Sequence, residues 1–135
     1  MKMPEKIDAS LLAPCGMNCL LCTRFLRAKE PCRGCLFTDE NKPEHCRKCF
    51  KKDCTAARGI TYCVECEEYP CRRMKYMEET YRTRYLMSLD ENGRFALRYG
   101  PEAFMERERE KRACRKCGGV ISIHERACSE CGQKV

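Results

Sequence analysis

The chain has 135 residues, of which 15 are cysteine, and a formal net charge of +7 at pH 7. Its hydrophobic fraction of 43% counts those cysteines and falls to about 32% without them, so any core is thin and needs disulfides or bound metal for stability. Lys6 and Asp8 lie where a signal peptide would carry its apolar run, and no stretch approaches the length of a membrane span. We therefore expect a cytoplasmic protein without a membrane partner, whose thiols stay reduced.

The spacing of the cysteines favours metal over disulfides. Six CxxC pairs occur along the chain, and this spacing lets two thiolates face one tetrahedral ion at about 2.3 Å. Two pairs complete one structural zinc site, so the sequence predicts three or four zinc ions per chain. The candidate ligands are Cys15, Cys19, Cys22, Cys32, Cys35, Cys46, Cys49, Cys54, Cys63, Cys66, Cys71, Cys114, Cys117, Cys128 and Cys131.

Residues 1–71 hold 11 of the cysteines and are predicted to form an irregular, cysteine-rich metal-binding domain of zinc knuckles. Two pairing schemes are open. Consecutive pairing, which closes the shorter loops, gives one site at Cys19, Cys22, Cys32 and Cys35 and another at Cys46, Cys49, Cys63 and Cys66. The alternative groups Cys54, Cys63, Cys66 and Cys71, and adds Cys46 and Cys49 to an N-terminal set.

Consecutive pairing leaves Cys15, Cys54 and Cys71 without a site. Two interpretations of these three cysteines are open. They are small buried hydrophobic residues, or they are ligands of a further site that His45 completes. His124 lies four residues before Cys128. A histidine beside a knuckle more often forms local hydrogen bonds than binds the ion.

The triplet Cys15, Cys19 and Cys22 supports an alternative cofactor, because its CxxxCxxC spacing is typical of an iron–sulfur cluster with one open iron in radical enzymes that use S-adenosylmethionine. Such enzymes need a partial or full barrel, and a complete barrel has roughly 200 residues or more. This chain lacks the alternating strand and helix pattern. An electron-transfer cluster needs no barrel and remains the redox alternative. No other catalytic set is evident, so we expect a protein that is not an enzyme.

Residues 72–112 contain no cysteine and are predicted to form two or three linking helices. Apolar side chains recur at helical spacing from Met74 to Tyr85. Ser88 followed three residues later by Glu91 matches a capping box, and Gly100 followed by Pro101 predicts one helix end and the next helix start.

The same segment carries the best candidate for a partner surface. Arginines next to tyrosines suit contacts with phosphate and stacking on bases, so protein or nucleic acid is the expected partner. The competing interpretation is a solvated helix face with its tyrosines turned inward. Charge alone is a weak guide, because each zinc with four thiolates adds about −2 and three such sites lower the net charge to about +1. The arginines are Arg72, Arg73, Arg82 and Arg84.

Residues 113–135 read as a zinc ribbon, with two CxxC pairs separated by ten residues. Val120, Ile121 and Ile123 suit a short strand between the pairs, and Gly118 and Gly132 suit the two knuckle turns.

The motifs CGMNCLLC, CRGC, HCRKCFKKDC and YCVECEEYPC resemble, in order and spacing, a prokaryotic cysteine-rich family known as domain of unknown function 3795. The tail CRKCGGVISIHERACSECG is similar to the ribbon appended in some members, although Ser122 stands where a further cysteine often occurs. The resemblance implies a metal-binding module without an established activity. We therefore expect a small metal-stabilised protein that acts as a zinc-binding structural or adaptor module.

Overall fold

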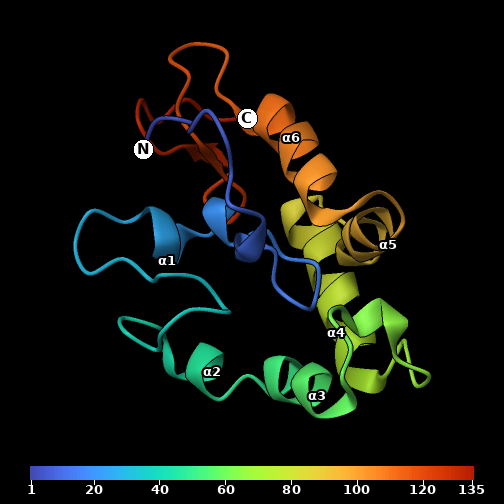
Figure 1. The fold of residues 1–135 in the computed structure, drawn as a ribbon. Coiled ribbons are helices and arrows are strands. Elements are labelled where there is room, and N and C mark those ends of the chain that lie inside the picture. Colours follow the sequence, from blue (N-terminus) through green and yellow to red (C-terminus); the bar gives the residue numbers. More distant parts are fainter.

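The computed structural model describes residues 1–135 and is mainly helical, with one two-stranded sheet near the C-terminus (Figure 1). None of its helices combines the length and apolar character needed to cross a membrane. The α-helices are α1 (Thr23–Leu26), α2 (Glu44–Arg47), α3 (Phe50–Arg58), α4 (Arg72–Thr80), α5 (Leu89–Tyr99) and α6 (Pro101–Arg112). Short 3-10 turns are η1 (Ala9–Leu11), η2 (Cys19–Leu21) and η3 (Cys63–Glu65), and the π-helical turn η4 (Tyr81–Tyr85) continues α4. The antiparallel strands are β1 (Ile121–Ser122) and β2 (Ala127–Cys128).

The linking helices form where local signals predict them. Ser88 is the N-cap of α5, and its hydroxyl accepts a hydrogen bond from the amide of Glu91 at 3.1 Å. Gly100, at a φ of 93°, ends α5, and Pro101 occupies the first turn of α6. Of the two or three linking helices that the sequence predicts, the structure has three, α4, α5 and α6. Within α5, Gly93 packs closely against η3, and a Cβ at this position would lie 3.0 Å from the side chain of Val64.

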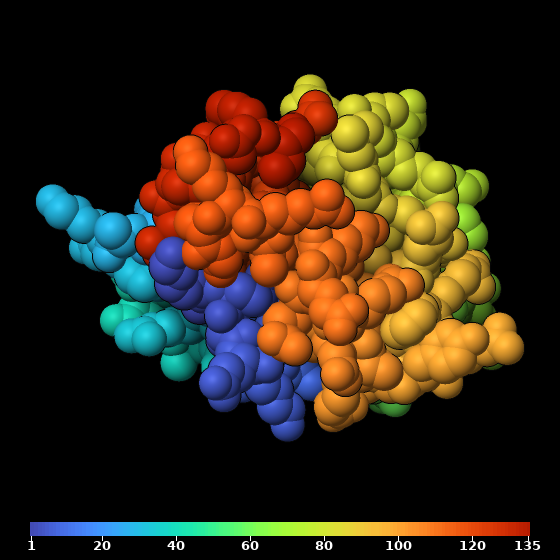
Figure 2. All heavy atoms as spheres, turned by 90° about the horizontal axis from the view of Figure 1, so that it is seen from above, coloured from blue at the N-terminus to red at the C-terminus, as the bar shows by residue number.

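The N-terminal residues pack against the C-terminal hairpin formed by β1, β2 and their flanking turns. The amide of Met3 donates to the carbonyl of Gly118 at 2.9 Å, and the amide of Val120 donates to the carbonyl of Met1 at 2.8 Å. Figure 2 shows the N-terminal segment, in blue, lying beside both the red hairpin and orange α6. One hydrophobic cluster joins residues of all three predicted segments, including Leu20, Phe104 and Val120. The two ends of the chain are therefore parts of one packed body.

Gly16 lies at a tight contact between the cysteine-rich segment and α5. Its φ is +98°, and a Cβ there would overlap the carbonyl oxygen of Leu89. The Gly16 carbonyl accepts a hydrogen bond from the Asn92 side chain at 3.0 Å. The conformation and the close approach both require glycine at this position.

We expect Gly16→Ala to lower the free energy of unfolding by more than the roughly 1–2 kcal/mol that a left-handed conformation costs, because the added methyl also pushes α5 away. Urea denaturation of the metal-loaded chain measures the change. Gly59→Ala is the matched control, since Gly59 has a φ of +67° and nothing lies within 4 Å of its Cβ position. Equal decreases in the free energy of unfolding of the two variants would show that the contact with α5 does not contribute to stability.

Candidate metal centres

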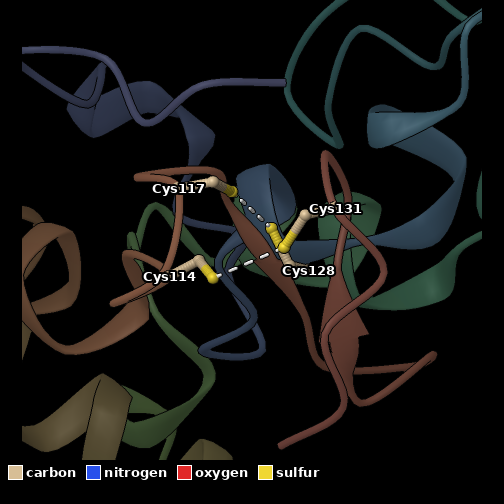
Figure 3. Close-up of side chains that lie close together, drawn as sticks. All are labelled: Cys114, Cys117, Cys128 and Cys131. Atoms are coloured by element: carbon tan, nitrogen blue, oxygen red, sulfur yellow. Dashed lines mark hydrogen bonds between the residues drawn. The ribbon is translucent and has the colours of Figure 1, made fainter.

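Four thiols converge at the C-terminal hairpin (Figure 3). Their sulfur atoms all lie within 4.8 Å of one another, and no other group of three or more candidate ligands in the chain is so close together. The sulfur of Cys117 is 3.4 Å from that of Cys128, and the sulfur of Cys114 is 3.9 Å from that of Cys131. This set, the C-terminal cluster, can hold one metal ion with four sulfur ligands.

Backbone geometry prepares the C-terminal cluster for a negative charge. The amide of Glu130 donates to the sulfur of Cys128 at 3.4 Å. Desolvation opposes ionisation of this thiol. Hydrogen bonds from the amides of Cys131 and Glu130, together with hydrogen bonds from the neighbouring thiols, nevertheless lower the pKa of Cys128 to about 6. A Cβ at Gly119 would lie 2.7 Å from the same sulfur. The glycine that permits this close approach is therefore Gly119, whereas Gly118 supplies the predicted knuckle turn, at a φ of 74°.

The cysteine-rich segment encloses a cavity of about 390 Å³, called here the large cavity. Its walls come from η2, α1, α2, the loop between α1 and α2, and the residues around α4 and η4. The aromatic rings of Tyr81 and Tyr85 close one side, together with His124 from the hairpin. The thiols that line it are those of Cys15, Cys19, Cys22, Cys32, Cys35, Cys46 and Cys49.

Cys35 contacts Cys19 within this group. Its amide donates to the sulfur of Cys19 at 3.4 Å. Burial raises the pKa values of Cys15 to about 12 and of Cys46 to about 11, and the nearby Cys35 thiolate adds to both shifts. The pKa of Cys35 itself is lowered to about 7, mainly by the hydrogen bond from the thiol of Cys19, with a further contribution from nearby lysine charges, while burial opposes the shift. Cys35 is thus the thiol of this cavity that ionises most readily near neutral pH.

A buried ammonium group stands at the wall of the large cavity. The side chain of Lys42 has no exposed surface, and its Nζ donates to the carbonyls of Cys35 at 2.9 Å and Phe37 at 3.0 Å. Its one anionic partner is Asp39, at 3.2 Å, whose side chain is 58% exposed. Burying a charge is costly unless opposite charge is close. Lys42 therefore places a positive charge at the wall of the large cavity, a feature that the sequence analysis did not identify.

A second, small cavity of about 30 Å³ lies on the other side of α3. Cys63 and Cys66, which consecutive pairing joins to Cys46 and Cys49, line this cavity instead of the large one. This space exceeds the roughly 10–15 Å³ that a cavity needs to hold one water molecule. The four thiols that line it are those of Cys54, Cys63, Cys66 and Cys71.

The two histidines, His124 on the hairpin and His45 on α2, both line the large cavity but come from different parts of the chain. Nδ1 of His124 accepts a hydrogen bond from the amide of Thr23 at 3.3 Å, and Nε2 lies 3.4 Å from the hydroxyl of Tyr81. Burial lowers the pKa of His124, so the ring is neutral and its lone pair is already used. His124 thus ties the hairpin to the cysteine-rich segment. His45 lines the large cavity from α2.

The four arginines proposed for a partner surface are separated. Arg72 and Arg73 line a groove of about 460 Å³ at the start of α4. Arg82 forms ion pairs with Glu78 at 2.6 Å and Glu91 at 3.8 Å. Arg84 is exposed on η4, away from this groove.

The folded chain is a small, mostly helical, cysteine-rich protein with a C-terminal four-cysteine cluster that can bind a metal ion. Residues 11–76 match the model of a family described as "Protein of unknown function (DUF3795)". That stretch contains every N-terminal cysteine, and the C-terminal cluster lies outside it. No curated protein and no solved structure matches the chain.

Proposed function

We propose that the protein is a zinc-stabilised adaptor, not an enzyme, and that it binds single-stranded nucleic acid at the groove beside α4. The observation that carries the proposal is the lining of this groove. Phe50, Lys51, Arg72, Arg73, Tyr76 and Met77 form it, and no acidic side chain does. A basic groove with exposed aromatic rings tracks a phosphate backbone and stacks bases.

The geometry of the groove residues fits this role. Tyr76 is 73% exposed, so its ring is free to stack on a base. The guanidinium of Arg73 lies 4.2 Å from the ring centroid of Phe50, which holds it at the groove surface. Tyr81 and Tyr85 turn inward toward the large cavity, so of the three tyrosines only Tyr76 serves the surface.

Zinc supplies the stability that such a small core lacks. The C-terminal cluster has the ligand type, number and spacing that zinc prefers, and thiolate ligands favour zinc in the reducing cytoplasm. The redox alternative needs an iron–sulfur cluster at Cys15, Cys19 and Cys22, and the positions of these three thiols in the large cavity suit zinc equally.

We expect Arg72→Ala/Arg73→Ala to weaken binding of a labelled oligonucleotide and to flatten its salt dependence. Each phosphate contact with a single strand contributes about 0.7 to the slope of log K against log salt, so two lost contacts reduce the slope by about 1.4. Tyr76→Ala should cost about 1–3 kcal/mol of binding free energy through lost stacking. Fluorescence anisotropy over a salt series measures both effects.

Arg98→Ala/Lys111→Ala is the control, because it removes the same charge from exposed positions on α5 and α6. Equal weakening by the two double variants would mean that net charge, and not the groove, determines binding. An absence of binding by the metal-loaded wild-type chain would exclude nucleic acid as the partner.

A further inference from the structure

Helix α3 directs one of its cysteines into the small cavity. Phe50, Cys54 and Arg58 recur at intervals of four residues, so they lie on one face of this helix, and all three line the small cavity. Cys49, the N-cap of α3, lines the large cavity and not the small one. Cys46 also lines only the large cavity. The two cysteines before α3 and the one within it therefore belong to different sets of candidate ligands.

The turn that carries the CxxC pair of the small cavity is fixed by its own residues. The carboxylate of Glu65 accepts hydrogen bonds from the amides of Thr61 and Tyr62, both at 2.8 Å. Within the turn, the amide of Cys66 donates to the carbonyl of Cys63 at 3.0 Å. A CxxC turn of this kind can offer two thiolates to one tetrahedral ion.

Cys71 adds a fourth thiol from the start of α4. It is the N-cap of this helix, and its side chain forms no capping hydrogen bond, so the sulfur is free to bind an ion. The N-terminal end of a helix carries a partial positive charge that favours a nearby thiolate. The amide of Lys75 donates to the carbonyl of Cys71 at 2.9 Å, which fixes the backbone of Cys71 in the first turn.

The rest of the lining suits a buried anionic centre. One zinc ion with four thiolates has a net charge of about −2. Lys51 and Arg58 line the small cavity, and no acidic side chain does. Their positive charges lower the cost of burying the centre, although Arg58 shares its charge with Glu68. Most of the other side chains that line the cavity are apolar, including those of Ile60 and Met74.

The four sulfurs of the small cavity are more widely spaced than those of the C-terminal cluster, since outside that cluster no three candidate ligands lie within 4.8 Å of one another. Rotation of a cysteine side chain between staggered rotamers moves its sulfur by about 3 Å. The cavity between these four side chains has a volume of only about 30 Å³. We therefore expect side-chain rotation to bring the sulfurs around one ion without a change in the backbone.

We infer that one zinc ion binds in the small cavity through a set of four thiolates, called here the small-cavity set, from Cys54, Cys63, Cys66 and Cys71. Cys46 and Cys49 take no part in this site. The inference decides between the two groupings that the spacing of the cysteines leaves open. It rests on the zinc chemistry of the proposed function and is independent of nucleic-acid binding.

Native mass spectrometry of the full chain, purified without oxygen and without a tag, tests the grouping. Cys54→Ser/Cys71→Ser should hold one zinc ion fewer than the wild-type chain, and so should Cys63→Ser/Cys66→Ser. Combining all four substitutions should release no second ion, because the four thiols bind the same one. A full zinc count in Cys54→Ser/Cys71→Ser, or the release of two ions by the combined variant, would overturn the inference while leaving zinc-based folding intact.

A second measurement needs no variant. The zinc-loaded wild-type chain is treated with increasing chelator, and N-ethylmaleimide then labels the thiols that each step exposes. The small-cavity set should become labelled as one group, at a step different from that of Cys46 and Cys49. Labelling of Cys63 and Cys66 in step with Cys46 and Cys49 would contradict the inference. Labelling of the whole small-cavity set before chelator is added would also overturn it, without bearing on the C-terminal cluster or on nucleic-acid binding.

Discussion

Complete removal of metal from the full chain is expected to abolish its cooperative thermal transition and most of its tertiary contacts. A structural zinc site contributes about 10–16 kcal/mol to folding in finger peptides at neutral pH. The net stability of a whole domain is about 5–15 kcal/mol. The free energy lost with even one such site is therefore larger than the stability that the single hydrophobic cluster can supply.

Circular dichroism and calorimetry in the presence of a reductant and a strong chelator measure this effect. Return of the transition after zinc is added back would show that the loss is reversible and caused by the metal. A chain that keeps its spectrum and transition midpoint after full chelation would be folded by its apolar core alone, and the role of metal in stability would have to be abandoned.

Replacement of one ligand of the C-terminal cluster, as in Cys128→Ser, is expected to release that ion and to unfold the hairpin locally. The hairpin has only two residue pairs in its sheet, so we expect an ion held by both of its turns to contribute strongly to its local stability. Unfolding of the hairpin should also release the N-terminal segment, because the amides of Met3 and Val120 form the hydrogen bonds between this segment and the hairpin. Hydrogen exchange at these two amides should become fast, while the amides of α5 stay protected.

Ser129→Ala is the control for this experiment, since it changes the neighbouring residue and removes a hydroxyl but no thiol. Its hydroxyl lies 3.2 Å from the Met1 carbonyl, so a small change at the N-terminus is expected without loss of metal. Unchanged protection at Val120 in Cys128→Ser, despite one fewer bound ion, would show that apolar packing alone holds the hairpin in place.

The position of the aromatic residues suggests how the metal centres and the linking helices depend on each other. Tyr81 and Tyr85 lie on η4, and each has its ring beside that of His124 on the hairpin. All three line the large cavity. We therefore expect ions bound there to stabilise contacts between the cysteine-rich segment, the continuation of α4 and the hairpin. The groove beside α4 shares Lys51 and Met77 with this cavity wall, so we expect metal loading to support the proposed binding surface as well.

The sequence by itself determined the features that depend on neighbouring residues. The cap at Ser88, the break at Gly100 and the strand at Ile121 are all where the sequence predicts them. So is the convergence of the four C-terminal thiols, because two CxxC turns on one short hairpin have few other ways to meet.

Only the tertiary structure decided which thiols of residues 1–71 face the same cavity. Every candidate ligand there has the same chemistry, and the pairing of consecutive CxxC motifs joins Cys63 to Cys46. The path of α3 and the packing of α4 against it place Cys63 beside Cys54 instead. The burial of Lys42 and the inward position of Tyr81 likewise depend on segments distant in the chain. Spacing fixes local turns, whereas the grouping of identical ligands follows from long-range packing that no single motif encodes.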